Sequence, residues 1–259
     1  MNSSNIPMTR AALALLVLAG AVALPQAQAA GTAATTSIQN RATISYSVGG
    51  NAQTPIESSP TGNSTPGTNA GASTVFVVDN RVDLTITEVA GSATLVNPGE
   101  LNAVATYLVT NTGNAAQAYQ LTPTNVVGGA LFGNTDSIDV NNLRVFVDAN
   151  NNGTYEVATD TATSIATLAA DAGVRVFIVA DVPVTATNLQ YASARLTAAA
   201  AVNNTPATLL VQSAGADGAG TVEIVFADGA SAGGDVLRNG RFAADDQYAV
   251  QSAALTVQK

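Results

Sequence analysis

The sequence predicts an all-β protein with an antiparallel β-sandwich, and three observations lead to this prediction. Short apolar segments with period-two alternation recur along the chain. Turns rich in Gly, Pro and Asn separate these segments at short intervals. No convincing amphipathic helix follows residue 30, because the Ala-rich residues 162–172 are interrupted by threonines and carry no charge pairs. Such spacing of strands and turns is typical of sandwiches and not of βαβ units.

Residues 1–29 have the features of a cleaved secretory signal peptide. Arg10 supplies the positive charge, residues 11–24 are apolar, and Ala27-Gln28-Ala29 is an A-x-A cleavage site. The apolar segment is shorter than the ~20 residues that a transmembrane helix needs. An uncleaved membrane anchor is the alternative. We therefore expect export to the cell surface or the extracellular space, with the periplasm as a further possibility, and no membrane span in the mature chain.

Residues 30–79 are predicted to form N-terminal strands around a flexible loop rich in Pro, Gly and Ser (49–73). Residues 42–48 alternate and place Ile44, Tyr46 and Val48 on one face. Residues 74–78 form a continuous apolar run, which suits a strand buried on both of its faces.

Residues 80–212 are predicted to form the main sandwich. Residues 82–87 alternate, so that Val82, Leu84 and Ile86 should point inward. Further strands are expected at residues 104–110, around Tyr119 and Leu121, and at 143–147, 174–179 and 192–200. Residues 213–259 are expected to form acidic, Gly-rich loops and a final strand at 254–259.

Composition removes several chemistries. The chain of 259 residues contains no Cys, His or Trp, so disulfides, the Ser-His-Asp triad and the common zinc sites are excluded. Lys and Arg number 9 against 18 Asp and Glu, and an acidic surface repels nucleic-acid phosphates. We therefore expect neither an enzyme nor a nucleic-acid partner. A carboxylate-based hydrolase remains a weaker alternative, since no Trp is present to stack on a sugar.

The most specific chemical signal is the segment that begins at Asp148. Asp148-x-Asn150-x-Asn152-Gly153 matches the first half of the calcium loop of EF-hands, in which alternate oxygens point inward and the Gly allows a sharp turn. The main-chain oxygen of Thr154 occupies the seventh position. The predicted calcium ligands are therefore Asp148, Asn150, Asn152, Thr154, Glu156 and Asp160.

The match to a calcium loop is partial. Thr159 stands at the twelfth position in place of Glu, and strands, which we expect to form a hairpin, flank the loop in place of helices. We expect a weak structural calcium site with a dissociation constant of roughly 10⁻⁴–10⁻³ M. The alternative is a plain Asn-Gly turn without metal. Other acidic groups have no such template; they are Asp136, Asp139, Asp228, Asp235, Asp245 and Asp246.

Several segments together resemble one family. They are the signal peptide, residues 40–46, Asp83-Leu84-Thr85, Pro98-Gly99, residues 107–114 and residues 255–259. These are similar to the conserved-repeat domain of bacterial surface proteins (domain of unknown function eleven). The resemblance implies immunoglobulin-like sandwiches on or outside the cell. The loop 49–73 looks longer than such modules need. Many such proteins continue into further repeats after a strand like the one ending at Lys259, so we expect either a truncated array or a protein whose last strand has another use.

The resulting functional expectation is a secreted structural or cell-surface protein, serving as a matrix, fibre or envelope component. Residues 254–259 could complete the sheet of a neighbouring copy by strand exchange, and so could the N-terminal segment. Ordinary pairing within one chain is the alternative. A second functional hypothesis is an adhesin-type module that recognises a surface glycan or protein through loops of the sandwich.

Overall fold

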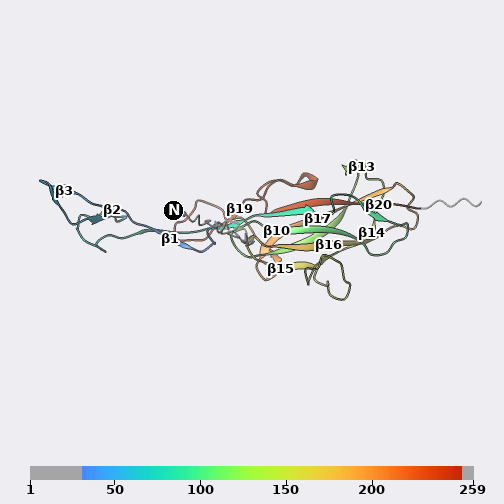
Figure 1. Ribbon diagram of the computed structural model, residues 1–259, viewed down its shortest axis with the longest axis horizontal. Helices are drawn as coiled ribbons and strands as arrows, with labels where there is room; N and C mark the ends of the chain where they lie inside the picture. Colours follow the sequence, from blue (N-terminus) through green and yellow to red (C-terminus); the bar gives the residue numbers. More distant parts are fainter. Residues whose placement is uncertain (1–30, 253–259) are drawn as a thin grey trace, which may run out of the picture.

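The computed structural model describes residues 31–252, which form two facing β-sheets and a long N-terminal arm (Figure 1). The predicted signal peptide and the predicted final strand 254–259 lie outside the described residues. The four-stranded sheet has the order β14-β16-β10-β8, and the larger sheet has the order β15-β11-β17-β20-β9, with β18 also paired to β17. These two sheets confirm the predicted all-β sandwich.

The bounds of the four-stranded sheet are β8 (Leu84–Glu88), β10 (Ala103–Asn111), β14 (Asn141–Val147) and β16 (Gly173–Asp181). Those of the six-stranded sheet are β9 (Thr94–Val96), β11 (Gln117–Val126), β15 (Ser164–Leu168), β17 (Tyr191–Val202), β18 (Thr205–Leu209) and β20 (Arg241–Val250). Smaller pairs are β7 (Asn80–Val82) with β19 (Ile224–Phe226) and β12 (Ala130–Leu131) with β13 (Asn134–Thr135). A short 3₁₀ turn, η1 (Ala232–Gly234), precedes β20.

The strand order corresponds to that of immunoglobulin-like sandwiches. Strands β8-β10-β16-β14 take the places of A-B-E-D, and β11-β17-β20 take those of C-F-G. The pairing is antiparallel except at two places: β9 lies parallel to β20, and β7 lies parallel to β19. The chain therefore crosses from the four-stranded sheet at β8 to the larger sheet at β9. Because β9 lies parallel to β20, this edge of the larger sheet is parallel and not antiparallel.

The core follows from the alternation within the strands. Val82, Leu84 and Ile86 are buried, as predicted. Strand β17 is rich in Ala, which leaves room for large rings between the sheets. Tyr107 of β10 donates a hydrogen bond to the carbonyl of Ala194 (2.8 Å), and Tyr248 of β20 donates one to Ile178 (3.1 Å). Each buried tyrosine therefore bonds to the main chain of the opposite sheet and ties the two layers together.

The sandwich does not end at residue 212. Strand β20 lies between β17 and β9 and pairs with nine successive residues of β17, from Tyr191 to Ala199. The predicted C-terminal unit of loops (213–259) thus supplies a strand inside the larger sheet. The polar residues of β20 hid this assignment, because Asp245, Asp246 and Gln247 interrupt its apolar pattern.

The arm (31–78) is a long β-hairpin that projects from one end of the sandwich (Figure 1). Its nested pairs are β1 (Ser37–Asn40) with β6 (Thr74–Val77), β2 (Thr43–Ile44) with β5 (Ile56–Glu57), and β3 (Ser47–Val48) with β4 (Asn51–Ala52). Gly49 and Gly50 form the tip with φ of 58° and 82°, as a two-residue turn with positive φ at both positions requires.

One prediction for this segment is wrong, and a second is wrong in part. Residues 74–78 are not buried on both faces, since β6 pairs with β1 outside the sandwich and leaves Val75 and Phe76 exposed. The predicted loop 49–73 is a loop only in part, because it contains the turn at the tip and the returning strands β4 and β5, whereas residues 58–73 contain no strand. Within residues 31–252, no helix is long and apolar enough to cross a membrane.

Candidate calcium loop and arm junction

All six predicted calcium ligands lie in one loop, residues 148–160, between β14 and β15. The loop is not part of a hairpin, because β14 belongs to the four-stranded sheet and β15 to the six-stranded sheet. A single bond from the Val147 amide to the Ala162 carbonyl (2.8 Å) joins the two ends of the connection. The loop therefore bridges the two sheets at the edge of the sandwich.

Two buried carboxylates close this loop from within. The amides of Asn152 and Gly153 donate to Asp148 Oδ1 (3.2 Å) and Oδ2 (2.8 Å). The amides of Ala149 and Glu156 donate to Asp160 Oδ1 (2.9 Å) and Oδ2 (2.8 Å). Hydrogen bonds from main-chain N–H groups to ionised carboxylates are strong, and they compensate for the burial of both charges.

The remaining predicted ligands lie at the surface of the loop. The side-chain nitrogens of Asn150 and Asn152 donate to Glu156 Oε2, at 2.6 Å and 3.1 Å. The oxygens of the same two amides accept from the main chain, Asn150 from the Asn152 amide (3.2 Å) and Asn152 from the Thr154 amide (2.8 Å). Calcium at this place would have to displace the amide nitrogens from Glu156, and this cost keeps any affinity low.

Gly153 sits where the loop turns back on β16. Its φ is +79°, and a Cβ at this position would lie 3.6 Å from Nε of Arg175. The Arg175 guanidinium also donates to Asn151 Oδ1 (3.5 Å). On the other side of the loop, Tyr155 stacks on Phe146 with ring centroids 5.2 Å apart. The loop is thus fixed by its own contacts, and a positive charge already lies beside it.

A second acidic group, which the sequence pattern did not reveal, lies at the base of the arm. Ligand oxygens of Asp79, Asp217 and Glu223 lie within 4.8 Å of one another; among the described residues this is the group of three acids that could surround a cation. The Glu223 amide donates to Asp79 Oδ1 (3.0 Å), and Oε2 of Glu223 is buried without a hydrogen-bond partner in the described part of the chain. No spacing rule detects residues so far apart in sequence.

The turn at 111–114 anchors the arm. The Asn114 side chain donates to the carbonyls of Thr32 (3.1 Å) and Asp79 (2.9 Å) and accepts from the Arg81 amide (2.8 Å). Buried Asn111 holds the turn itself, because its side chain accepts from the Gly113 amide (3.0 Å). Its Asn-Thr-Gly-Asn sequence is that of a turn, and the structure shows that this turn also joins the arm to the end of β10.

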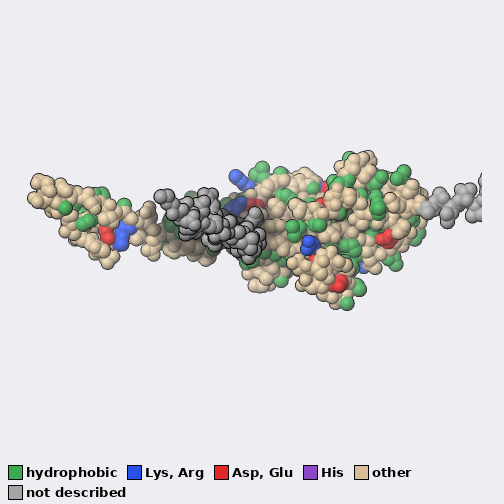
Figure 2. Space-filling model, viewed as in Figure 1, with side chains coloured by type: hydrophobic (Ala, Val, Ile, Leu, Met, Phe, Trp, Pro, Cys, Tyr) green, Lys and Arg blue, Asp and Glu red, His purple; other side chains and the backbone are tan. Residues whose placement is uncertain are grey.

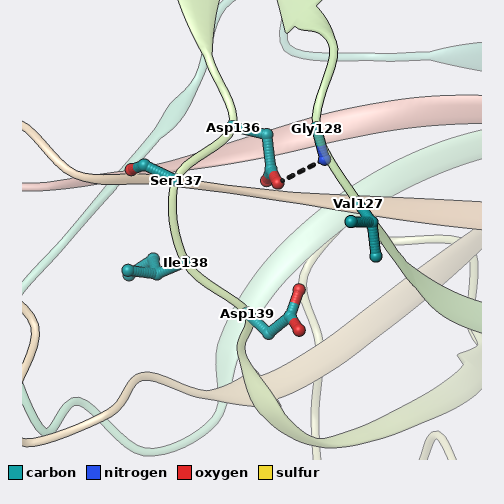
Figure 3. A pocket seen from close by; sticks show the side chains of 6 residues that line it. All are labelled: Val127, Gly128, Asp136, Ser137, Ile138 and Asp139. Carbon is teal, nitrogen blue, oxygen red and sulfur yellow. Dashed lines mark hydrogen bonds between the residues drawn. The ribbon is translucent and has the colours of Figure 1, made fainter.

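The other acidic residues do not form a common site. Asp136 accepts from the amides of Gly128 (3.0 Å) and Ser193 (2.7 Å), so it closes the loop that lines a surface hollow together with Asp139 (Figure 3). Asp228 accepts from the amides of Asn239 (3.0 Å) and Gly240 (2.8 Å).

Asp245 and Asp246 are neighbours with opposite surroundings. Asp245 forms a bidentate ion pair with Arg195 (2.6 and 2.8 Å), and these hydrogen bonds raise the pKa of Arg195. Asp246 is fully buried, and its Oδ2 has no hydrogen-bond partner among the described residues. Burial raises the pKa of Asp246 to about 7, against the lowering effect of the Gln247 amide.

Comparisons with known proteins show no family for this chain, and the similar solved structures are distant. No family model and no curated protein matches the chain, so the resemblance to the conserved-repeat domain stays a prediction. One similar solved structure is the ASH/PapD-like domain 7 of human CEP192, with 11% identity and a TM-score of 0.29 over 67% of this chain and 87% of that one. Another is AvmM, which catalyses macrocyclization in alchivemycin A biosynthesis, with 7% identity and a TM-score of 0.29 over 71% and 95%.

Proposed function

We propose that this chain is an exported structural protein of the cell surface or the extracellular space, and that it functions by associating with further copies. The arm is the observation that carries this proposal. It is a hairpin outside the sandwich core, and a two-stranded hairpin with no packed face is only marginally stable in water. A protein that maintains such an arm gains stability when the arm finds a partner.

We also propose that the chain is not an enzyme. The buried carboxylates of Asp148, Asp160 and Asp228 all accept main-chain N–H groups that close loops. They therefore have structural tasks, and none of these acids is free to serve as a general acid or base.

The location and the assembly are tested together. The full chain is expressed in a bacterium with residues 1–30 present, and cells are fractionated and treated with protease from outside. We expect the protein in the surface or extracellular fraction, and we expect the purified mature chain to form concentration-dependent assemblies in light scattering. Retention in the cytoplasm would contradict export, and a monomer at every concentration would contradict assembly.

A further part of the proposal is weak calcium binding at the loop 148–160. The alternating oxygens of Asp148, Asn150 and Asn152 and the closure of the loop by Asp148 support it. With a dissociation constant of about 10⁻³ M, 5 mM calcium would raise the free energy of unfolding by about 1 kcal/mol. This corresponds to a rise in Tm of about 2–4 °C.

Two variants locate the ion. Asp148→Asn should abolish the rise in Tm, whereas Asp217→Asn, which removes a carboxylate at the arm junction, should preserve it. An unchanged Tm of the wild-type protein at 10 mM calcium would refute calcium binding. A rise that survives Asp148→Asn but disappears in Asp217→Asn would place the ion at the arm junction.

A further inference from the structure

Several carboxylates of this acidic chain point inward from loops. Figure 2 shows few acidic side chains on the visible face of the sandwich. Asp148 and Asp228 are only 2% and 1% exposed, although neither lies in a strand. A buried carboxylate needs strong hydrogen-bond donors, and main-chain N–H groups supply them here. In both loops these N–H groups belong to an Asn followed by a Gly.

The chain contains two such pairs, Asn152-Gly153 and Asn239-Gly240. An Asn-Gly pair is prone to deamidation, because Gly has no Cβ to obstruct the reaction. The Gly nitrogen loses its proton and forms a bond to Cγ of the Asn. The bond between Cγ and Nδ2 then breaks, and Nδ2 takes up a proton and leaves as ammonia. Water opens the resulting succinimide ring to aspartate or isoaspartate.

Asp148 holds the first pair. The amides of Asn152 and Gly153 donate to its Oδ1 (3.2 Å) and Oδ2 (2.8 Å). The Asn152 side chain is fixed at both of its polar atoms, since Oδ1 accepts from the Thr154 amide (2.8 Å) and Nδ2 donates to Glu156 Oε2 (3.1 Å). Hydrogen bonds therefore occupy the attacking nitrogen, the amide oxygen and the leaving nitrogen.

Asp228 holds the second pair in the same way. The amides of Asn239 and Gly240 donate to its Oδ2 (3.0 Å) and Oδ1 (2.8 Å). Oδ1 of Asn239 accepts from the Arg241 amide (2.8 Å), and Nδ2 donates to Asp235 Oδ1 (2.8 Å). The same four kinds of contact thus recur around both Asn-Gly pairs.

The two arrangements arise from different local sequences. Asp148 lies four residues before its Asn, and Asp228 lies eleven residues before its own. The first loop joins β14 to β15, and the second joins β19 to β20. A single local motif does not account for the match, and what the two loops share is the Asn-Gly pair with a buried carboxylate behind it.

We propose that Asn152 and Asn239 are deamidation sites of this chain, and that Asp148 and Asp228 prevent the reaction while their loops are closed. This inference concerns the chemical durability of the chain and does not rest on the proposed function. When the Gly nitrogen loses its proton, its electron pair points along the former N–H bond, toward the carboxylate and away from Cγ of the Asn. The carboxylate also opposes a second negative charge on that nitrogen. Attack therefore requires the loop to open.

Deamidation would disrupt the loop in which it occurs. Nδ2 of Asn152 donates to Glu156, and Nδ2 of Asn239 donates to Asp235. An oxygen in place of Nδ2 would bring two carboxylates together, and like charges so close repel. Because the loop 148–160 bridges the two sheets, protection of Asn152 preserves that bridge.

The first experiment compares the folded and the unfolded chain. The mature chain (30–259) is incubated at pH 8 with EDTA, either without denaturant or in guanidinium chloride, and mass spectrometry of its peptides quantifies deamidation at each Asn. Both pairs should react in the unfolded chain. In the folded chain both should react roughly a hundredfold more slowly or less, because opening breaks two amide–carboxylate hydrogen bonds. Similar rates in the two states at either pair would overturn the proposal.

Two variants then test the carboxylates themselves. In the folded chain, Asp148→Asn should accelerate deamidation of Asn152 by roughly tenfold or more and leave Asn239 unchanged. Asp228→Asn should have the reverse effect, so each variant is the control for the other. Circular dichroism verifies that each variant is folded. If one of them is not, the other variant and the comparison of the two wild-type states decide.

Asp160→Asn is the matched control within the first loop. Asp160 is also buried and also accepts two main-chain amides, but these belong to Ala149 and Glu156 and not to the Asn-Gly pair. It should accelerate the reaction of Asn152 much less than Asp148→Asn does. Equal acceleration would show that general loosening of the loop controls the reaction, and a slower reaction in Asp148→Asn would show that the carboxylate acts as a base. Either result would overturn the proposal.

Discussion

The side chain of Asp246 faces the interior of the sandwich, on the same side of β20 as Tyr248 and Val250. Its Oδ2 finds no hydrogen-bond partner in the described residues, and the hydroxyl of Tyr107 bonds elsewhere, to Ala194. A buried carboxyl with incomplete hydrogen bonding favours its neutral form, which accounts for a pKa of about 7.

This pKa makes the free energy of unfolding depend on pH. The folded state holds the Asp246 proton up to about pH 7, whereas the unfolded chain releases it near pH 4. The proton on Asp246 contributes its full stabilisation below about pH 4. This contribution falls as the pH rises from 4 to 7, and it is lost above about pH 7. A difference of about three pKa units corresponds to a loss on the order of 4 kcal/mol. Asp246→Asn cannot ionise, so it should be more stable than the wild type at pH 8 and differ less at pH 4.

Urea unfolding at pH 4, 6 and 8 measures this effect. Asp245→Asn is the control, since the neighbouring carboxylate is paired with Arg195 on the outer face and should not show the same dependence. A constant difference between Asp246→Asn and the wild type at all three pH values would contradict the buried-acid interpretation.

Gly113 shows a constraint of a different kind. A Cβ at this position would overlap the main-chain carbonyl of Arg81, which cannot move without opening the turn. Gly113→Ala should therefore destabilise the protein by about 2–3 kcal/mol, seen as a lower midpoint in urea. Gly220→Ala is the control, because nothing lies within 4 Å of its Cβ position. Equal midpoints for the two variants would show that the turn relaxes freely.

At the scale of elements, the arm junction is held by polar side chains and not by a packed core. Asn114 supplies hydrogen bonds to three residues from both sides of the hairpin base. Gln117 adds a bond from its side chain to Asn80 Oδ1 (2.8 Å). Because a polar hydrogen bond contributes about 1 kcal/mol net, we expect this junction to open without unfolding of the sandwich.

Asn114→Ala should accordingly loosen the arm more than the sandwich. We expect faster amide hydrogen exchange across residues 32–40 and 74–82 and little change within β10 and β16. Asn125→Ala is a matched control, because Asn125 makes a similar reciprocal pair of bonds with the main chain of Val140. Uniformly faster exchange in Asn114→Ala would mean that the turn supports the whole fold.

The sequence predicted those elements whose burial is visible in local alternation. Val82, Leu84 and Ile86 follow period two because β8 and the end of β7 have one face in the core. Phe76 lies in a continuous apolar run that predicted burial, but this run belongs to the arm, and only the tertiary arrangement decides that Phe76 is exposed.

The two candidate sites also differ in whether local sequence reveals them. The loop at Asp148 is contiguous, so its residues could be found by spacing. Asp79, Asp217 and Glu223 meet only because β7 and β19 pair, and the parallel register of these strands has no signature in either segment alone.

At the scale of the whole molecule, the sandwich and the arm differ in how they are stabilised. The buried apolar cluster contains no residue of 31–78. A chain that begins at Asp79 should therefore fold with a Tm within about 4 °C of the intact protein and a slightly smaller m-value in urea. Circular dichroism melting checks this prediction. A truncated chain that fails to unfold cooperatively would show that the arm belongs to the folding unit.

The two parallel strand pairs have a mechanical consequence. Strand β7 follows directly after the arm and lies parallel to β19, and β9 lies parallel to β20, the last strand of the described residues. When tension is applied through the arm at one end and through the chain beyond Val250 at the other, the strands of each parallel pair are pulled in opposite directions along their length. The hydrogen bonds between them run across the pulling direction, so they bear the load together and do not open one at a time. Tension along the long axis would therefore load both parallel pairs in shear.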